Sequence, residues 1–218
     1  MLILERYLGS DLPQGEAARI AAAKVALGNC LYELGYVERA LAVHTESLGI
    51  AKGLVDARGV MPEHRWRLSR DLLAVGRVDA AAAEAEQART EPLPDDPFSQ
   101  ASTRAALAEA RAAQGWSAEG EALFRTAISI LEPLGYGIFT ADVRVRFAVF
   151  LISQDRRDKA RLHLEAARDF YSDPLAIHKR EAIEALLRQC DDVAAPEEAK
   201  ARREHVSAVN DEKGGREV

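Results

Sequence analysis

The sequence lacks the features that mark several classes of protein. It contains only two cysteines among 218 residues, which excludes a small domain held together by disulfides. No window approaches the roughly 20 apolar residues of a membrane-spanning helix. Positive charge is not in excess, because 29 Lys and Arg stand against 35 Asp and Glu and give a formal charge of −6. This balance argues against non-specific binding to nucleic acid or to acidic membranes.

Motifs with known catalytic chemistry are also missing. The five histidines are scattered, and none lies in a metal-ligand spacing such as His-Glu-x-x-His. There is no Gly-x-Ser-x-Gly and no phosphate-binding loop, and Gly135-x-Gly137 follows a predicted helix rather than a strand. We expect His44 to be a packed core residue and Cys30 to face a helix interior and be inert. The sequence therefore predicts no enzyme activity, no cofactor and no metal site.

The cysteines and the N-terminal residues bear on where the protein works. Cys30 and Cys190 lie near opposite ends of the predicted helical region, so several helix layers of roughly 8–10 Å separate them. A disulfide needs Cα atoms within about 7 Å, so we expect both thiols to be reduced. Residues 1–8 are interrupted by Glu5 and Arg6 and carry no cleavage-site pattern, unlike a signal peptide. Together these features predict a cytoplasmic location.

The chain is organised around a helical hairpin in residues 27–48. Leu27, Leu31 and Leu34 recur at helical spacing. Gly35 can end a helix with a positive φ, and the apolar spacing resumes directly after it. Two helices this short cannot bury their own apolar faces, so they need neighbouring helices.

The same pattern recurs three more times along the chain. Each copy has a Leu or Phe followed by a small residue, and a turn residue about two helical turns later. The turn residues are Gly35, Gly76, Gly115 and Asp155. Asp is acceptable at the last turn because it visits the left-handed region more readily than most residues. A near-constant step of about 40 residues indicates a repeat array.

The predicted elements divide the chain into three parts. Residues 1–14 form an N-terminal helix or cap, residues 15–190 a solenoid, and residues 191–218 a charged, mostly disordered tail. The predicted hairpins span about 15–52, 62–90, 98–132 and 138–171, followed by a last helix to about Cys190. The apolar residues within 2–8 are expected to lie on the first hairpin. Either this segment is a short cap, or the chain is part of a longer array.

With these columns aligned, residues 15–190 resemble the tetratricopeptide repeat (TPR) family. The residues that match its Leu-Gly pair and its later small residue are Leu27-Gly28, Leu68-Ser69, Leu107-Ala108, Phe147-Ala148, Ala40, Ala81, Gly120 and Ala160. Arg111 departs from a column that is otherwise Leu. The long step is similar to the repeats of kinesin light chains and of bacterial TPR regulators. The resemblance implies an all-α, right-handed helical-hairpin solenoid of four repeats with a C-terminal capping helix.

The resemblance also implies a concave groove, lined by the first helices of successive hairpins, that binds a peptide or helix. The side chains offset from the buried positions should line it, namely Asn29, Tyr32, Glu33, Trp66, Arg70, Leu73, Glu109, Val149 and Ile152. Tyr32, Trp66 and Arg70 are the sharpest candidates, because aromatic and Arg residues dominate binding energy where contacts are desolvated. Trp66 has an alternative role, filling a gap between neighbouring first helices.

A basic column runs through the four copies and consists of Lys24, Arg65, Arg104 and Arg144. It could be a ladder for an acidic peptide or another anion. The alternative is structural: the long stems cover apolar helix surface while the charged ends reach water or a neighbouring carboxylate. Acidic residues such as Glu63 lie near enough in sequence to neutralise the column, so we favour the structural role.

The sequence therefore predicts a cytoplasmic protein-protein interaction module that takes a peptide or helix in its groove. The alternative is a peptide- or ligand-sensing regulatory module of a bacterial transcription or signalling regulator, in which the ligand changes the curvature of the array. The expected partner is a protein or peptide, and neither a membrane nor a nucleic acid is expected. A homodimer through the ends of the solenoid stays open.

Overall fold

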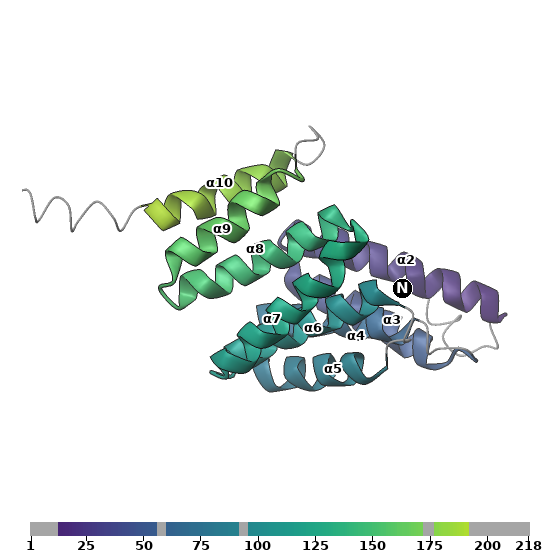
Figure 1. Cartoon of the computed structure of the whole chain (residues 1–218). Helices are drawn as coiled ribbons and strands as arrows, with labels where there is room; N and C mark the ends of the chain where they lie inside the picture. The colour runs from purple at the N-terminus through teal and green to yellow at the C-terminus, as the bar shows by residue number, and fades with distance from the viewer. Residues whose placement is uncertain (1–12, 56–59, 92–95, 172–176, 192–218) are drawn as a thin grey trace, which may run out of the picture. The chain divides into compact units, whose positions relative to one another are not determined.

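The structure is a computed structural model that describes residues 13–55, 60–91, 96–171 and 177–191, and within these ranges it contains helices and no strand (Figure 1). The helices are α2 (Gln14–Glu33), α3 (Val37–Lys52), α4 (Met61–Ala74), α5 (Val78–Thr90), α6 (Pro97–Ala113), α7 (Ser117–Leu131), the short 3-10 helix η1 (Glu132–Leu134), α8 (Gly137–Ser153), α9 (Arg157–Arg168) and α10 (Ile177–Asp191). The four predicted hairpins correspond to α2–α3, α4–α5, α6–α7 and α8–α9. The predicted all-α repeat fold is confirmed.

Each hairpin turns through the same helix-ending motif. The turn residues Gly35, Gly76 and Gly115 have φ values of 82°, 76° and 85°, and Asp155 has 56°. After the first turn, the Tyr36 N–H donates to the Leu31 carbonyl at 2.8 Å, and the equivalent bond recurs after the other three turns. This is the Schellman motif, which satisfies a carbonyl that the helix end would otherwise leave unpaired. The predicted turn residues are therefore confirmed.

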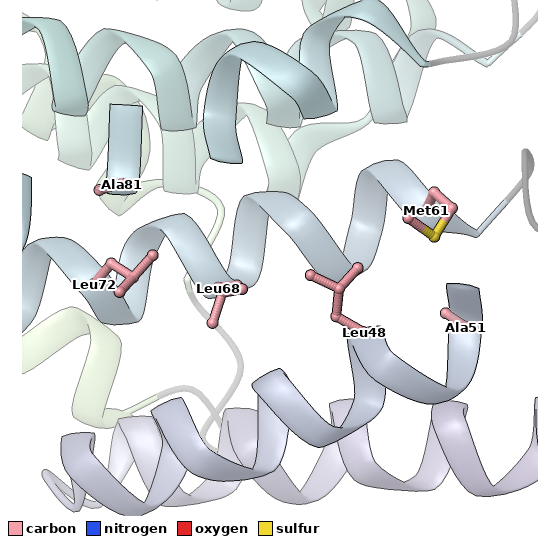
Figure 2. Close-up of a cluster of buried hydrophobic side chains, with 6 residues drawn as sticks. All are labelled: Leu48, Ala51, Met61, Leu68, Leu72 and Ala81. Carbon is pink, nitrogen blue, oxygen red and sulfur yellow. The ribbon is translucent and has the colours of Figure 1, made fainter. Parts of the chain in front are cut away.

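The core lies between hairpins, where the second helix of one hairpin packs on the first helix of the next. Figure 2 shows Leu48 of α3 beside the face of α4 that carries Leu68 and Leu72. Ala51 and Met61 close the same cluster near the α3–α4 connection. The side chains in this layer are buried, so packing between neighbouring hairpins adds to the packing within each hairpin.

The next layer is built from smaller side chains around one tryptophan. Trp66 of α4 packs with Ala85 and Ala88 of α5 and with Ala106 and Leu107 of α6. Alanine allows close approach of helix axes, and the indole fills the space that the small residues leave. Of the two roles considered for Trp66, the structure shows the gap-filling one.

The described chain forms two compact units, and the boundary between them follows Val143 inside α8. The first unit contains the three hairpins α2–α3, α4–α5 and α6–α7. In the second unit α9 packs on α10, and Leu164, Ile183 and Leu187 are buried. Most of the predicted N-terminal cap lies outside the described residues. The same is true of the predicted disordered tail.

The prediction that Cys30 faces a helix interior is wrong. Cys30 is exposed on α2, because no described helix precedes the first hairpin to cover this face. Cys190 is buried on α10, where burial raises the pKa of its thiol. Both cysteines are free thiols in the structure. Among the described helices, none combines the length and apolar character needed to cross a bilayer.

Candidate protein-binding surface

A cavity of about 290 Å³ lies between α2 and α4, the first helices of the first two hairpins. Its α2 wall is a stripe of small residues, Ala18, Ala22 and Ala26, which are exposed and recur once per helical turn. Leu54 and Val60, which flank the connection into α4, add apolar surface at one end. The cavity therefore opens to the surface over an apolar floor.

The rim of this cavity is polar and ordered by one arginine. Arg67 of α4 donates from Nε and Nη2 to Oε1 of Glu63 at 3.2 and 2.9 Å, and from Nη1 to Oδ1 of Asn29 on α2 at 2.6 Å. Burial lowers the pKa of Arg67, while the carboxylate of Glu63 acts in the opposite direction. The Asn29 amide nitrogen and the second Glu63 oxygen have no hydrogen-bond partner among the described residues, so the rim still offers one donor group and one acceptor.

A second contact between α2 and α4 lies one helical turn further along. The Arg70 guanidinium sits over the Tyr32 ring, with its carbon 3.8 Å from the ring centroid. Nε and Nη2 of Arg70 are buried and have no hydrogen-bond partner among the described residues. The ring stabilises the cation through its π face but leaves these N–H groups unsatisfied.

Beneath the cavity, a buried histidine joins three helices. His44 of α3 and Asp71 of α4 are both 0% exposed, and His44 Nδ1 lies 2.5 Å from Asp71 Oδ2. His44 Nε2 lies 3.3 Å from the Val25 carbonyl of α2, which only accepts, so this nitrogen carries a hydrogen. His44 therefore links α3 to both α4 and α2 through buried hydrogen bonds. The prediction that His44 is a packed core residue is confirmed.

A second buried hydrogen-bond chain runs beside the first. The Ser47 hydroxyl donates to the Ala21 carbonyl at 2.7 Å, so it must accept from His64 Nδ1, 2.9 Å away. This assigns the hydrogen of the neutral imidazole to Nδ1 and leaves Nε2 without one. Burial lowers the pKa of His64, and the charges of His44 and Arg67 act in the same direction while Glu63 opposes them. His64 is therefore neutral at physiological pH.

These serine, histidine and aspartate side chains do not form a hydrolytic triad. Ser47 bonds to His64, whereas Asp71 bonds to His44, so no single imidazole links the hydroxyl to the carboxylate. Ser47 is 0% exposed, and its hydrogen is committed to a carbonyl. In the described part of the chain, no cluster of three His, Cys, Asp or Glu side chains could hold a metal ion. The arrangement joins helices and shapes the cavity wall.

The structure brings together part of the predicted groove. Asn29, Tyr32 and Arg70 lie on facing sides of α2 and α4, and Glu33 is exposed next to them. The remaining predicted residues are elsewhere: Trp66 and Leu73 pack on the core, Glu109 is half-buried on α6, and Val149 and Ile152 belong to the second unit.

The basic column pairs mostly within hairpins. Lys24 of α2 contacts Glu46 of α3 at 2.5 Å, and Arg65 of α4 contacts Glu84 and Glu91 at 2.7 and 3.0 Å. Burial opposes the charge of Arg65, but hydrogen bonds to the two carboxylates raise its pKa overall. Two members bond differently: Arg104 donates to the Gln100 carbonyl and Arg144 to His163. These partners match the structural role favoured above.

The cavity itself was not foreseen from the sequence. Its lining residues include Ala18, Ala22, Ala26, Glu63, His64 and Arg67. A stripe of alanines at helical spacing was the available signal, but such a stripe equally predicts close helix packing. The position of the charged rim could not be predicted from the sequence. The hydrogen bond from Arg67 to Asn29 joins residues of different repeats, and the sequence pattern does not show which residues of neighbouring repeats meet.

The comparison with solved structures supports the fold described above. No family model and no curated protein matches the sequence. Among solved structures, a Podosopora anserina protein described as a putative kinesin light chain with nearly identical TPR-like repeats is 19% identical and has a TM-score of 0.58, with 92% of this chain and 99% of that chain covered.

Two further structures have lower TM-scores. A thermophilic TPR protein from Thermus thermophilus has a TM-score of 0.52 at 20% identity, with 87% of this chain and 98% of that chain covered. BtubC, or BKLC, from P. vanneervenii has a TM-score of 0.50 at 17% identity, with 89% and 91% covered. At this identity the comparisons establish a shared fold.

Proposed function

The chain has the all-α fold of TPR-like repeat proteins, and on that premise we propose that it is a protein-binding scaffold. The solved structures that share its fold carry helical repeats of the same kind. The expectations that it works in the cytoplasm and is not an enzyme belong to the same proposal. Its partner is a protein or peptide rather than a nucleic acid or a membrane, because its net charge is −6.

The site proposed for the partner is the cavity between α2 and α4. The single observation that supports it is an exposed apolar floor next to polar atoms for which the described residues provide no partner, on the groove side predicted from the repeats. A peptide could insert an apolar side chain between the alanines while its backbone pairs with Asn29 and Glu63. At about 290 Å³ the cavity lies at the small end of ligand sites, so it suits a side chain better than a large cofactor.

The test fills the cavity without altering its rim. We expect the wild-type chain to enrich peptides from a random library displayed on phage, and Ala22→Trp to bind those peptides at least tenfold more weakly because the indole occupies the floor. Ala83→Trp, at an exposed position inside α5, is the matched control and should bind like the wild type. Thermal unfolding followed by circular dichroism checks that both variants fold.

Two results would contradict the site. Either the library yields no peptide that binds the wild type, or the selected peptides bind Ala22→Trp as tightly as the wild type. If the peptides lose affinity only on Arg70→Ala, then binding occurs further along the groove, at the Tyr32 contact.

The regulatory alternative is favoured by one observation. Ala21, Val25 and His64 line the cavity and also take part in the buried bonds that join the first two hairpins. A ligand in the cavity would therefore press on that joint and could change the angle between the hairpins. Small-angle scattering on the same peptide complex separates the two proposals, since a scaffold leaves the scattering profile unchanged.

A further inference from the structure

The outer face of α2 exposes positions that are buried in every comparable helix of the first unit. In α2 these positions are Ala23, Leu27 and Cys30, all of them exposed, and Leu27 is 51% exposed. The corresponding residues of α4 are His64, Leu68 and Asp71, and those of α6 are Thr103, Leu107 and Ala110, none more than 6% exposed. This face of α2 therefore corresponds to a face that other helices cover in the later hairpins. No described residue covers it on α2.

The later hairpins show what kind of element covers this face. On α4 the cover is α3, whose Leu48 lies in one cluster with Leu68 and whose His44 bonds to Asp71. On α6 the cover is α5, whose Ala85 and Ala88 pack with Leu107. In each case it is the helix that immediately precedes in the sequence, running back along the face. The occupant expected on α2 is therefore a short helix that precedes Gln14.

We propose that residues 2–8 are that helix, and that Ile3 and Tyr7 pack on Leu27 and Cys30. With Gly35 aligned on Gly76, Ile3 falls at the position of His44 and Tyr7 at the position of Leu48, the two residues of α3 that face α4. Both are large and apolar, as an inward-facing position requires, and they lie one helical turn apart.

The connection is long enough for this placement. From Leu8 to Gln14 the chain can span up to about 20 Å. The helix rise from Gln14 to Ala23 is about 14 Å, and neighbouring helix axes lie about 8–10 Å apart. Leu8 can therefore lie beside Ala23 while the residues before it run along Leu27 and Cys30. Residues 9–13 include Gly9 and Pro13, residue types that favour the end of one helix and the start of the next.

The exposed thiol on this face allows a direct test. The contact between His44 and Asp71 corresponds to a contact between residue 3 and Cys30, so Ile3→Cys places two thiols within reach of each other. In a glutathione redox buffer we expect Ile3→Cys to form an intrachain disulfide with Cys30, identified by peptide mass spectrometry. Leu4→Cys is the matched control, because position 4 corresponds to the exposed Thr45. Its thiol should point away from Cys30, so its effective concentration at the Cys30 thiol should be about tenfold lower than that of the thiol at position 3.

Each alternative gives a different result, and each overturns the proposal. If Ile3→Cys oxidises no more readily than Leu4→Cys, the segment does not lie on this face. If the disulfide joins two chains and grows with protein concentration, a second copy covers it. A readout without an added cysteine is the rate at which N-ethylmaleimide alkylates Cys30, which should rise at least tenfold in Tyr7→Asp; an equal rate overturns the proposal as well.

Discussion

Gly28 lies where the two helices of the first hairpin are in close contact. A methyl group added there would lie 2.3 Å from Nε2 and 2.5 Å from Cδ2 of His44. The ring cannot turn aside, because Asp71 and the Val25 carbonyl hold its two nitrogens. We expect Gly28→Ala to lower the free energy of unfolding by about 3 kcal/mol, the upper end of overpacking costs, as measured by urea denaturation.

Gly49 provides the control for that substitution. It lies inside α3 with no atom within 4 Å of an added Cβ. Gly49→Ala should therefore raise the free energy of unfolding by about 0.5–1 kcal/mol through helix propensity alone. If both substitutions change stability in the same direction, the close approach at Gly28 does not limit the packing of this hairpin.

His64 should make stability depend on pH. Burial lowers its pKa in the folded chain below the unfolded value of about 6.5, so the unfolded state binds more protons in that range. The contribution of neutral His64 is fully present above pH 6.5, and it is lost as the pH falls toward the folded pKa. The slope approaches about 1.4 kcal/mol per pH unit.

The variant that isolates this effect is His64→Asn, whose amide nitrogen can take the place of Nδ1 and donate to Ser47. Urea denaturation at pH 7.5, 6.5 and 5.5 should show the free energy of unfolding falling less steeply for His64→Asn than for the wild type. An unchanged pH dependence would mean that His64 titrates alike in both states.

At the scale of helices, the sequence was enough to predict where each hairpin begins and ends. The apolar spacing and the turn residues are local signals, and a residue with positive φ ends the first helix of every hairpin. Asp155 could be assigned to the same role as the three glycines because the repeat fixed its position.

What the sequence could not predict depends on which helices become neighbours. Cys30 occupies a column that is buried in α4 and α6, so the repeat predicted burial for a residue that is exposed. Trp66 had two possible faces, and the choice depended on the small residues of α5 and α6. The cavity arises from the spacing of α2 and α4, a distance that no single repeat encodes.

The buried ionisable pairs have the same origin. Asp71 lies in a column that is Cys30 in the first copy and Ala110 in the third, and only α3 supplies a histidine opposite it. A pair formed between repeats gives no periodic signal, because each partner appears once. This pair is therefore a specific feature of the joint between the first two hairpins.

At the scale of the whole molecule, a stack of hairpins stabilises each layer through its nearest neighbours. Within the first unit the described contacts follow this rule, since α3 packs on α4 and α5 packs on α6. A change at one joint should then weaken the layers beside it and leave more distant layers largely intact. A protein built around one closed core would lose stability everywhere at once.

Asp71→Ala tests this distinction by hydrogen exchange. Removing one partner of a buried ion pair costs about 3–5 kcal/mol, and His44 is left without its acceptor. The joint between α3 and α4 should open more often, so amides of α2 and α3 should exchange about a hundredfold faster or more. Amides of α6 and α7 should change much less, because their contacts do not include this joint.

The matched control is Glu46→Ala, which removes a carboxylate that also links α2 to α3 but is half exposed. An exposed pair contributes about 0–1 kcal/mol, so exchange in all helices should stay within roughly fivefold of the wild type. If Asp71→Ala accelerates exchange equally in α2–α3 and α6–α7, the first unit unfolds as one cooperative core and the nearest-neighbour account is wrong. If only α2–α3 responds, the first hairpin opens as an independent layer, as nearest-neighbour stabilisation predicts.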